Sequence, residues 1–232
     1  MSGEVIRTTN FVADAAGFIL QTAQRAMKDR GEFRIALSGG NTPRPVYREW
    51  ASAGRELSWD RLLITFGDER CVAPDDEQSN YRMARESLLD PAGLPEECVL
   101  RMRGELEPAM AAQEYEDHLT VLAEQRREQV YQHDLILLGV GDDGHTASLF
   151  PGTPALEVTD RKVVENFVPK LQVWRLTMTF PLINHARAVC FLIGAAKNPE
   201  LIEQVIAGDV RYPAARVKPS SGKLIWILGE KA

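Results

Sequence analysis

Short apolar runs recur along the chain between longer stretches in which apolar side chains are spaced as on one face of a helix. The short runs are rich in β-branched and aliphatic residues, a pattern typical of strands buried in a parallel sheet. They predict strands at 33–38, 62–66, 134–139, 163–167, 175–180, 188–194 and 224–228. The longer stretches predict helices at 11–28, 45–53, 80–89, 108–128 and 199–207.

Strands that alternate with helices in this way predict an α/β fold, with a parallel-dominated sheet covered by helices on both faces. Ligands of such sheets bind beyond the carboxyl ends of the strands, so we look for function in the loops that follow strands. No linker rich in Pro, Gly or Ser and no charge run interrupts the sequence. We therefore expect residues 1–232 to form a single domain.

Composition limits the kinds of partner and the cellular location that we expect for this protein. The 27 basic and 33 acidic side chains give a formal charge of −6, and no stretch concentrates Lys and Arg, so we expect neither nucleic acid nor a membrane as partner. No apolar run is long enough to span a bilayer, and the first residues lack a basic segment followed by an apolar one. Three widely spaced cysteines, Cys71, Cys98 and Cys190, encode no disulfide framework, which favours a cytoplasmic location.

The loop after the first predicted strand reads Ser38-Gly39-Gly40-Asn41-Thr42-Pro43. Its glycines allow a ligand to approach the backbone, and Thr42 followed by Pro43 can cap and open the next helix. An anion there would meet free N–H groups and the positive end of the helix dipole. The same residues also suit a simple strand-to-helix turn, and local sequence leaves both readings open.

The second predicted strand runs into Asp68-Glu69-Arg70, and Ser79-Asn80 follows at the start of a helix. Arg70 offers a planar fork suited to phosphate or carboxylate, while Asp68 and Glu69 can orient it or bind sugar hydroxyls. The alternative is a solvated turn in which Ser79 only caps the helix.

The third loop, Gly139–Gly152, is the densest in glycine, carboxylate and histidine. His145 lies on its glycine-flexed turn two residues after Asp143, a carboxylate that can fix the imidazole tautomer and raise its basicity. The other three histidines lie in or beside a charged helix or in a polar connection, where structural roles are expected. One histidine without a helical partner does not predict a metal site, and Ser148 is not in a Gly-x-Ser-x-Gly elbow.

Two further cations are candidates for binding an anion. Arg175 lies in an alternating strand, and Lys197 follows an apolar strand where a helix begins. The helix dipole disfavours a lysine there unless a negative group lies nearby.

Taken together, these segments resemble the 6-phosphogluconolactonases. The resemblance rests on Ser38–Pro43, on Asp68–Arg70 with Ser79-Asn80, and above all on Asp143-Gly144-His145-Thr146-Ala147-Ser148-Leu149-Phe150-Pro151. It implies a three-layer α/β/α sandwich with a modified Rossmann-like sheet, shared with glucosamine-6-phosphate deaminases. It also implies hydrolysis of 6-phosphogluconolactone to 6-phosphogluconate in the oxidative pentose phosphate pathway, with neither metal nor cofactor.

Carried onto this sequence, the resemblance makes His145 the acid/base that activates water and Asp143 its neighbour in the site. Backbone N–H groups near Gly144 are then expected to hold the oxyanion of the tetrahedral intermediate. The residues predicted to bind the phosphorylated lactone are Ser38, Gly39, Gly40, Asn41, Thr42, Asp68, Arg70, Asn80, Arg175 and Lys197.

Two other functions remain as alternatives. An amino-sugar-phosphate deaminase or isomerase of the same fold is similar, but those enzymes typically carry an aromatic residue where Arg70 stands and an Asn-Glu segment after the histidine. A non-catalytic sugar-phosphate-binding module would have to act through a partner, because the sequence shows no basic recognition helix.

Overall fold

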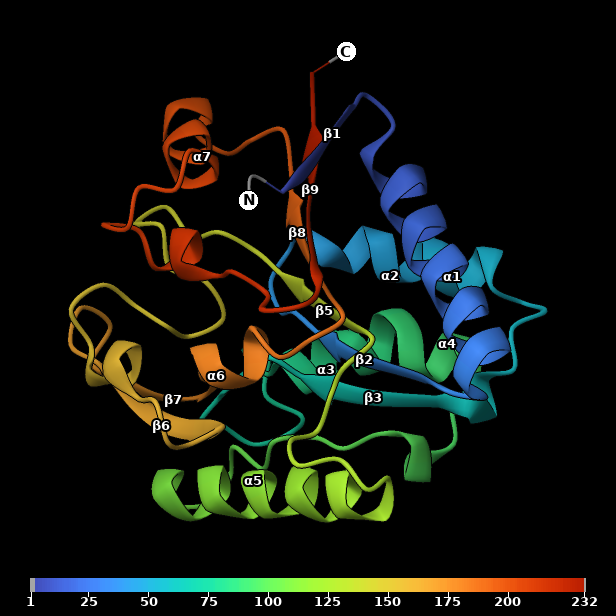
Figure 1. Ribbon diagram of the computed structural model, residues 1–232, viewed down its shortest axis with the longest axis horizontal. Coiled ribbons are helices and arrows are strands. Elements are labelled where there is room, and N and C mark those ends of the chain that lie inside the picture. The colour runs from blue at the N-terminus through green and yellow to red at the C-terminus, as the bar shows by residue number, and fades with distance from the viewer. Residues whose placement is uncertain (1–2, 232) are drawn as a thin grey trace.

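The computed structural model describes residues 3–231, and nine strands and seven α-helices are assigned within them (Figure 1). The strands are β1 (Glu4–Thr8), β2 (Phe33–Leu37), β3 (Leu62–Phe66), β4 (Asp68–Arg70), β5 (Leu135–Leu138), β6 (Val163–Val168), β7 (Val173–Met178), β8 (Ala188–Ile193) and β9 (Lys223–Gly229). The helices are α1 (Phe11–Arg30), α2 (Pro43–Ala53), α3 (Asn80–Ala84), α4 (Asp90–Ala92), α5 (Pro108–Gln125), α6 (Phe180–Ile183) and α7 (Pro199–Ile206).

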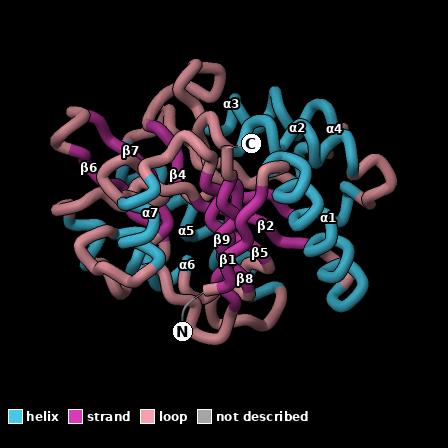
Figure 2. The backbone as a smooth tube through the Cα atoms, turned by 90° about the horizontal axis from the view of Figure 1, so that it is seen from above, coloured by secondary structure: helices cyan, strands magenta, loops and turns pink. Residues whose placement is uncertain are grey.

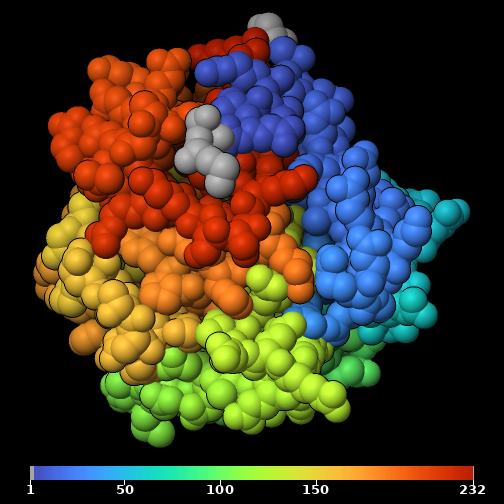
Figure 3. All heavy atoms as spheres, viewed as in Figure 1, coloured from blue at the N-terminus to red at the C-terminus, as the bar shows by residue number. Residues whose placement is uncertain are grey.

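Six strands form one parallel sheet in the order β1-β9-β8-β5-β2-β3. Because β1 pairs with β9, the first and last strands lie side by side, and the blue and red segments meet on the surface in Figure 3. The remaining strands form a small antiparallel sheet in the order β4-β7-β6.

Alternation along the central strands divides the core between the two faces of the large sheet. In β2, Ile35 packs with α1 and α2 in one cluster, whereas its neighbour Ala36 packs with α5 in the other. Figure 2 shows the same division: α1 to α4 lie on one side of the parallel strands, and α5 to α7 lie with the small sheet on the other. The predicted α/β fold with a mostly parallel sheet and helices on both faces is confirmed.

Two strands have no counterpart in the sequence prediction. β1 is an edge strand whose side chains are mostly exposed, so it carries no apolar run. β4 consists of Asp68, Glu69 and Arg70, which the sequence placed in a loop, and it is a strand only because it pairs with β7. Both depend on partners far along the chain.

Other predicted elements need correction. Segments 163–167 and 175–180 are strands, but they leave the parallel sheet and pair with each other antiparallel, and Phe180 already belongs to α6. The predicted helix at 80–89 is α3 followed by a π-helical turn at Arg85–Leu89. The helix predicted to reach residue 128 ends at Gln125. Within residues 3–231, no helix has both the length and the apolar character needed to cross a membrane.

Candidate active site

Two adjoining cavities, of about 300 and 270 Å³, lie where the loops after β2, β3 and β5 meet. Asp68, Arg70 and His145 line both. The first cavity is also lined by the Ser38–Thr42 loop and Lys197, and the second by Asp143 and Arg175. Every residue predicted for the site except Asn80 therefore borders one of the two cavities.

His145 is held by Asp143 through one ring nitrogen. The distance from Nδ1 to Oδ1 of Asp143 is 2.5 Å. Partial burial opposes ionisation of Asp143, but the hydrogen bond and charge of His145 and the charge of Lys170 outweigh it and lower the pKa of that carboxyl. An ionised carboxylate only accepts, so Nδ1 carries the proton and Nε2 is left as the basic nitrogen.

Two backbone N–H groups of the turn that carries His145 donate to acceptors within the same turn. Gly144 N donates to the Gly141 carbonyl at 3.0 Å, and His145 N donates to Asp143 Oδ1 at 3.2 Å. The N–H of Gly144 is therefore already paired. The N–H of His145 is paired as well, and the expectation that N–H groups near Gly144 hold the oxyanion stays a prediction for the other residues of this turn.

Asp68 is buried and held from two sides. Ser148 Oγ donates to its Oδ2 at 2.6 Å, and Asn80 Nδ2 donates to its main-chain oxygen at 2.9 Å and to Oδ1 at 3.2 Å. The amide of Asn80 also packs so closely on Gly39 that a Cβ there would lie 1.8 Å from it. Asn80 thus stands behind the cavity wall and supports both Asp68 and the glycine loop.

Glu69 points away from the cavities. Its carboxylate is buried and accepts from the backbone N–H groups of Arg70, Asn80 and Tyr81 and from Ser79 Oγ. Burial raises the pKa of Glu69, although these backbone donors oppose the shift. The side chain therefore ties β4 to the start of α3, where Ser79 Oγ accepts from Arg82 N as the predicted helix cap.

Arg70 and Arg175 form an uncompensated pair of cations. They lie directly opposite each other in the β4–β7 ladder, so their side chains share a face of the small sheet. Both Nε atoms are buried without a hydrogen-bond partner, and neither guanidinium forms an ion pair in the part of the chain that the structure describes. Burial, and then the charge of Arg70, lower the pKa of Arg175. Such a pair favours an anion between its members.

Lys197 already has a partner. Its Nζ lies 2.8 Å from Oδ1 of Asp142, so the negative group that the sequence required nearby is present. α7 begins only at Pro199, with Asn198 as its side-chain cap. On the opposite wall, Pro43 opens α2 as predicted, but the side chain of Thr42 makes no capping hydrogen bond because its backbone is already helical.

Among the polar and aromatic side chains that line the cavities, four were not predicted site residues: Asp142, Ser148, Phe150 and Lys170. Three of them lie in the predicted His145 loop, which is the signal that could have found them. Lys170 lies in the β6–β7 turn, and its Nζ is 3.5 Å from Oδ2 of Asp143. Nothing local to Lys170 indicates this contact, which arises from the position of the hairpin.

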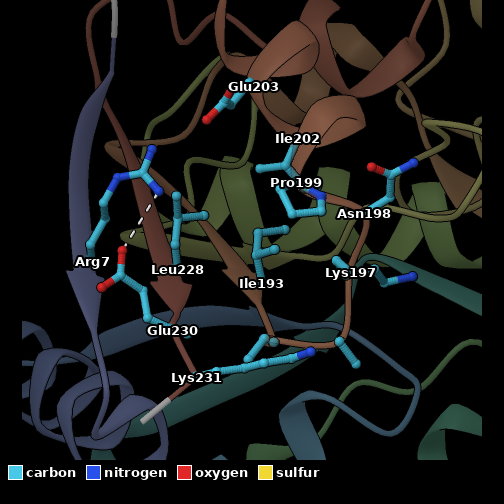
Figure 4. A pocket seen from close by; sticks show the side chains of 14 residues that line it. Arg7, Ile193, Lys197, Asn198, Pro199, Ile202, Glu203, Leu228, Glu230 and Lys231 are labelled. Carbon is cyan, nitrogen blue, oxygen red and sulfur yellow. Dashed lines mark ion pairs between the residues drawn. The ribbon is translucent and has the colours of Figure 1, made fainter.

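A larger cavity, of about 690 Å³, lies on the other side of the Gly194–Asn198 segment (Figure 4). Its walls include Arg7 and Glu230, which are 3.8 Å apart, and an apolar floor that contains Ile193. Lys197 is the one predicted site residue that borders it, and its amino group points away from the Arg7–Glu230 pair. Among residues 3–231, no group of three or more His, Cys, Asp or Glu side chains is arranged to hold a metal ion.

Comparisons with known proteins agree on one group. The family model described as glucosamine-6-phosphate isomerases/6-phosphogluconolactonase matches residues 7–226. A 6-phosphogluconolactonase from Synechocystis sp. is 43% identical over 90% of this chain and 86% of its own length. One from Nostoc sp. is 39% identical over 97% of this chain and 93% of its own length. The crystal structure of 6-phosphogluconolactonase from Thermotoga maritima superposes with a TM-score of 0.84 at 27% identity, covering 98% of this chain and 99% of that one.

Proposed function

The chain belongs to the glucosamine-6-phosphate isomerase/6-phosphogluconolactonase family, and on that premise we propose how its site acts. The protein is an enzyme that hydrolyses 6-phosphogluconolactone to 6-phosphogluconate, a step of the oxidative pentose phosphate pathway. One observation carries the mechanism. His145 is fixed through Nδ1 by an ionised Asp143, while its ring borders both cavities and its Nε2 has no partner among the described residues.

A lactone is an internal ester, so opening it requires an activated water, stabilisation of an oxyanion, and a proton for the ring oxygen. In our proposal Nε2 of His145 takes a proton from water as the water oxygen bonds to C1 of the lactone. The bond from C1 to the ring oxygen then breaks, and His145 returns the proton to that oxygen. Asp143 keeps the imidazole in the required tautomer and stabilises its protonated form.

The phosphate of the substrate belongs, in this proposal, between Arg70 and Arg175. These two guanidiniums lack an acidic partner, whereas the charge of Lys197 is already met by Asp142. Nη1 of Arg70 already donates to the Gln78 carbonyl at 2.6 Å, and a dianionic phosphate would accept from the remaining N–H groups of both guanidiniums and offset their mutual repulsion. Lys197 and the Ser38–Thr42 loop then remain for the sugar portion in the first cavity.

Asp68 would accept hydrogen bonds from sugar hydroxyls, because its carboxylate borders both cavities and is held in place by Ser148 and Asn80. Asn80 would act through Asp68 and Gly39. With the N–H of Gly144 occupied, we assign stabilisation of the oxyanion to the positive charge around His145, to which Lys170 contributes.

We also propose that residues 1–232 act as one catalytic domain, without nucleic acid as a partner, and that the protein works in the cytoplasm. Supporting the last point, Cys71, Cys98 and Cys190 are all free thiols, as expected in a reducing compartment.

The direct test is hydrolysis of 6-phosphogluconolactone freshly generated by glucose-6-phosphate dehydrogenase, measured against spontaneous opening. We expect the wild type to exceed the uncatalysed rate clearly. His145→Ala should lower kcat by about 10²–10⁴-fold, the usual contribution of a positioned acid/base. His118→Ala, an exposed histidine on α5, is the matched control and should retain activity.

A wild type no faster than spontaneous opening would overturn the assignment, and deamination of glucosamine 6-phosphate would be tested next. Near-normal turnover of His145→Ala would instead leave the activity in place and remove His145 from its role.

A further inference from the structure

One face of the His145 imidazole is covered by an aromatic ring. The ring of Phe150 stacks on it with centroids 3.9 Å apart and an interplanar angle of 24°. The backbone of Gly141 passes so close that a Cβ at that position would lie 2.0 Å from Cε1 and 2.1 Å from Nδ1. The ring is therefore confined by contacts in addition to its hydrogen bond with Asp143.

Phe150 is buried without being part of either hydrophobic core cluster. Its exposed fraction is 8%, the same as that of Phe180, yet Phe180 belongs to the cluster around α5 and Phe150 does not. Apart from bordering the second cavity, Phe150 has His145 as its aromatic partner among the described residues. The buried ring of Phe150 therefore packs mainly against the imidazole of His145, and not within the hydrophobic core.

The backbone of Phe150 is itself anchored. Its carbonyl accepts from Thr153 Oγ1 at 2.8 Å, and Asn166 Nδ2 on β6 donates to the same hydroxyl at 3.0 Å. The backbone that carries the aromatic ring is thus linked to the small sheet through Asn166, in addition to its link to the histidine turn through Leu149 N and the Thr146 carbonyl. This is the arrangement expected of a fixed surface against which another ring is held.

We propose that Phe150 is a positioning residue that holds the imidazole plane of His145 so that Nε2 points at the water that attacks the lactone carbon. The proposal rests on the function proposed above. The hydrogen bond to Asp143 restrains Nδ1, but the second side-chain torsion of histidine has a broad energy profile, and one restrained atom leaves the ring free to tilt. Stacking against Phe150 restrains that tilt, and small errors in the direction of a catalytic nitrogen are costly to rate.

The test compares Phe150→Leu, Phe150→Tyr and the matched control Phe180→Leu. We expect Phe150→Leu to lower kcat about tenfold with KM changed less than about twofold, because the substrate contacts remain while the base is misdirected. Phe150→Tyr keeps an aromatic ring and should restore most of kcat. Phe180→Leu removes a phenyl group of equal exposure and should lower thermal stability without lowering kcat.

A readout independent of turnover is the imidazole ¹⁵N spectrum of His145, assigned by the loss of its signals in His145→Ala. The wild type should show sharp signals of an Nδ1-protonated ring, and Phe150→Leu broadened signals of the same tautomer, because Asp143 still fixes the proton while the ring is free to tilt. Should Phe150→Leu fail to fold, Phe150→Met, whose flexible unbranched side chain adapts better to the space left by the ring, takes its place.

Normal kcat in Phe150→Leu with an active wild type and an inactive His145→Ala would overturn this inference and leave the proposed function intact. Equal losses in the Leu and Tyr variants would also overturn it. Absence of lactone hydrolysis by the wild type would instead overturn the proposed function itself.

Discussion

At the scale of single residues, some charged side chains of the site have an oppositely charged partner and others have none. Asp143 is committed to His145 and Asp142 to Lys197, whereas Arg70 and Arg175 face each other without an acid. Two adjacent, partly buried cations oppose folding of the free enzyme. The same pair is well suited to binding a dianionic ligand. The arrangement therefore favours ligand affinity at the expense of the stability of the unliganded protein.

Arg175→Met tests whether this residue increases affinity for the lactone while lowering the stability of the unliganded protein. We expect KM for the lactone to rise at least about tenfold, equivalent to roughly 1.4 kcal/mol of binding, because a charged fork to phosphate is lost. The melting temperature of the unliganded protein should stay equal or rise, because the like-charge contact with Arg70 is removed. Both quantities come from steady-state kinetics and thermal unfolding of the same preparations.

The control is Arg55→Met, an exposed arginine outside the two cavities, which should change neither quantity. Added inorganic phosphate should raise the melting temperature of the wild type more than that of Arg175→Met. A variant that melts several degrees lower while KM stays constant would show that Arg175 supports the fold and not the substrate.

At the scale of elements, the catalytic turn is held by a segment that lies far along the chain. Ala214 N donates to the carbonyl of Gly144 at 3.0 Å, and the ring of Tyr212 packs on the Cα of Gly144. Tyr212 is in turn tied to α7 by its hydroxyl, which donates to Gln204 Oε1 at 2.8 Å. The segment after α7 therefore braces the turn that presents His145.

Gly144→Ala should abolish most activity for two separable reasons. Gly144 has a φ of +77°, which disfavours any side chain, and a Cβ there would lie 2.3 Å from the Tyr212 ring. The double variant Gly144→Ala/Tyr212→Ala removes the clash but not the backbone strain. We expect it to be more active than the product of the two single effects predicts, by about three- to tenfold.

Multiplicative effects of the two substitutions would contradict the proposed contact. Circular dichroism of all three variants shows whether the loss of activity reflects the turn or general unfolding.

At the scale of the whole molecule, a buried group outside the site makes stability depend on pH. His133 is fully buried ahead of β5, with Nε2 2.9 Å from Thr65 Oγ1. Burial, and then the charges of Arg34 and His185, lower the pKa of His133 to about 3. The unfolded chain takes up this proton near pH 6.5 whereas the folded chain does not, so stability falls as the pH falls from about 6.5 towards 3.

His133→Gln should remove this dependence. The expected effect is that the wild type loses about 2 kcal/mol of unfolding free energy between pH 7 and pH 5, and that most of this loss disappears in the variant. Urea unfolding at the two pH values measures it. Glu32, whose pKa is lowered to about 2 by its hydrogen bond to Arg126, contributes only below about pH 4.5 and does not interfere.

His118→Gln, an exposed histidine, should behave as the wild type in this comparison. An equal loss between pH 7 and pH 5 in His133→Gln and the wild type would assign the acid sensitivity to other groups.

The hydrophobic pattern by itself determined the fold class, because a strand that is buried on both faces of a sheet requires apolar residues at consecutive positions. Neighbours such as Ile35 and Ala36 must both be apolar when they enter cores on opposite sides of the sheet. The His145 loop was also readable, since glycine, carboxylate and imidazole lie within a few residues of one another. Both features involve residues that are close together in the chain, so they can be recognised without knowing which distant segments meet.

Tertiary structure alone decided which distant groups meet. The pairing of Arg70 with Arg175 follows from the register of β4 and β7, and the contact of Lys170 with Asp143 follows from where the β6–β7 hairpin ends. β4 shows the reason most plainly. Three charged residues have no intrinsic preference for a strand, and they form one because a partner strand more than a hundred positions away satisfies their backbone hydrogen bonds.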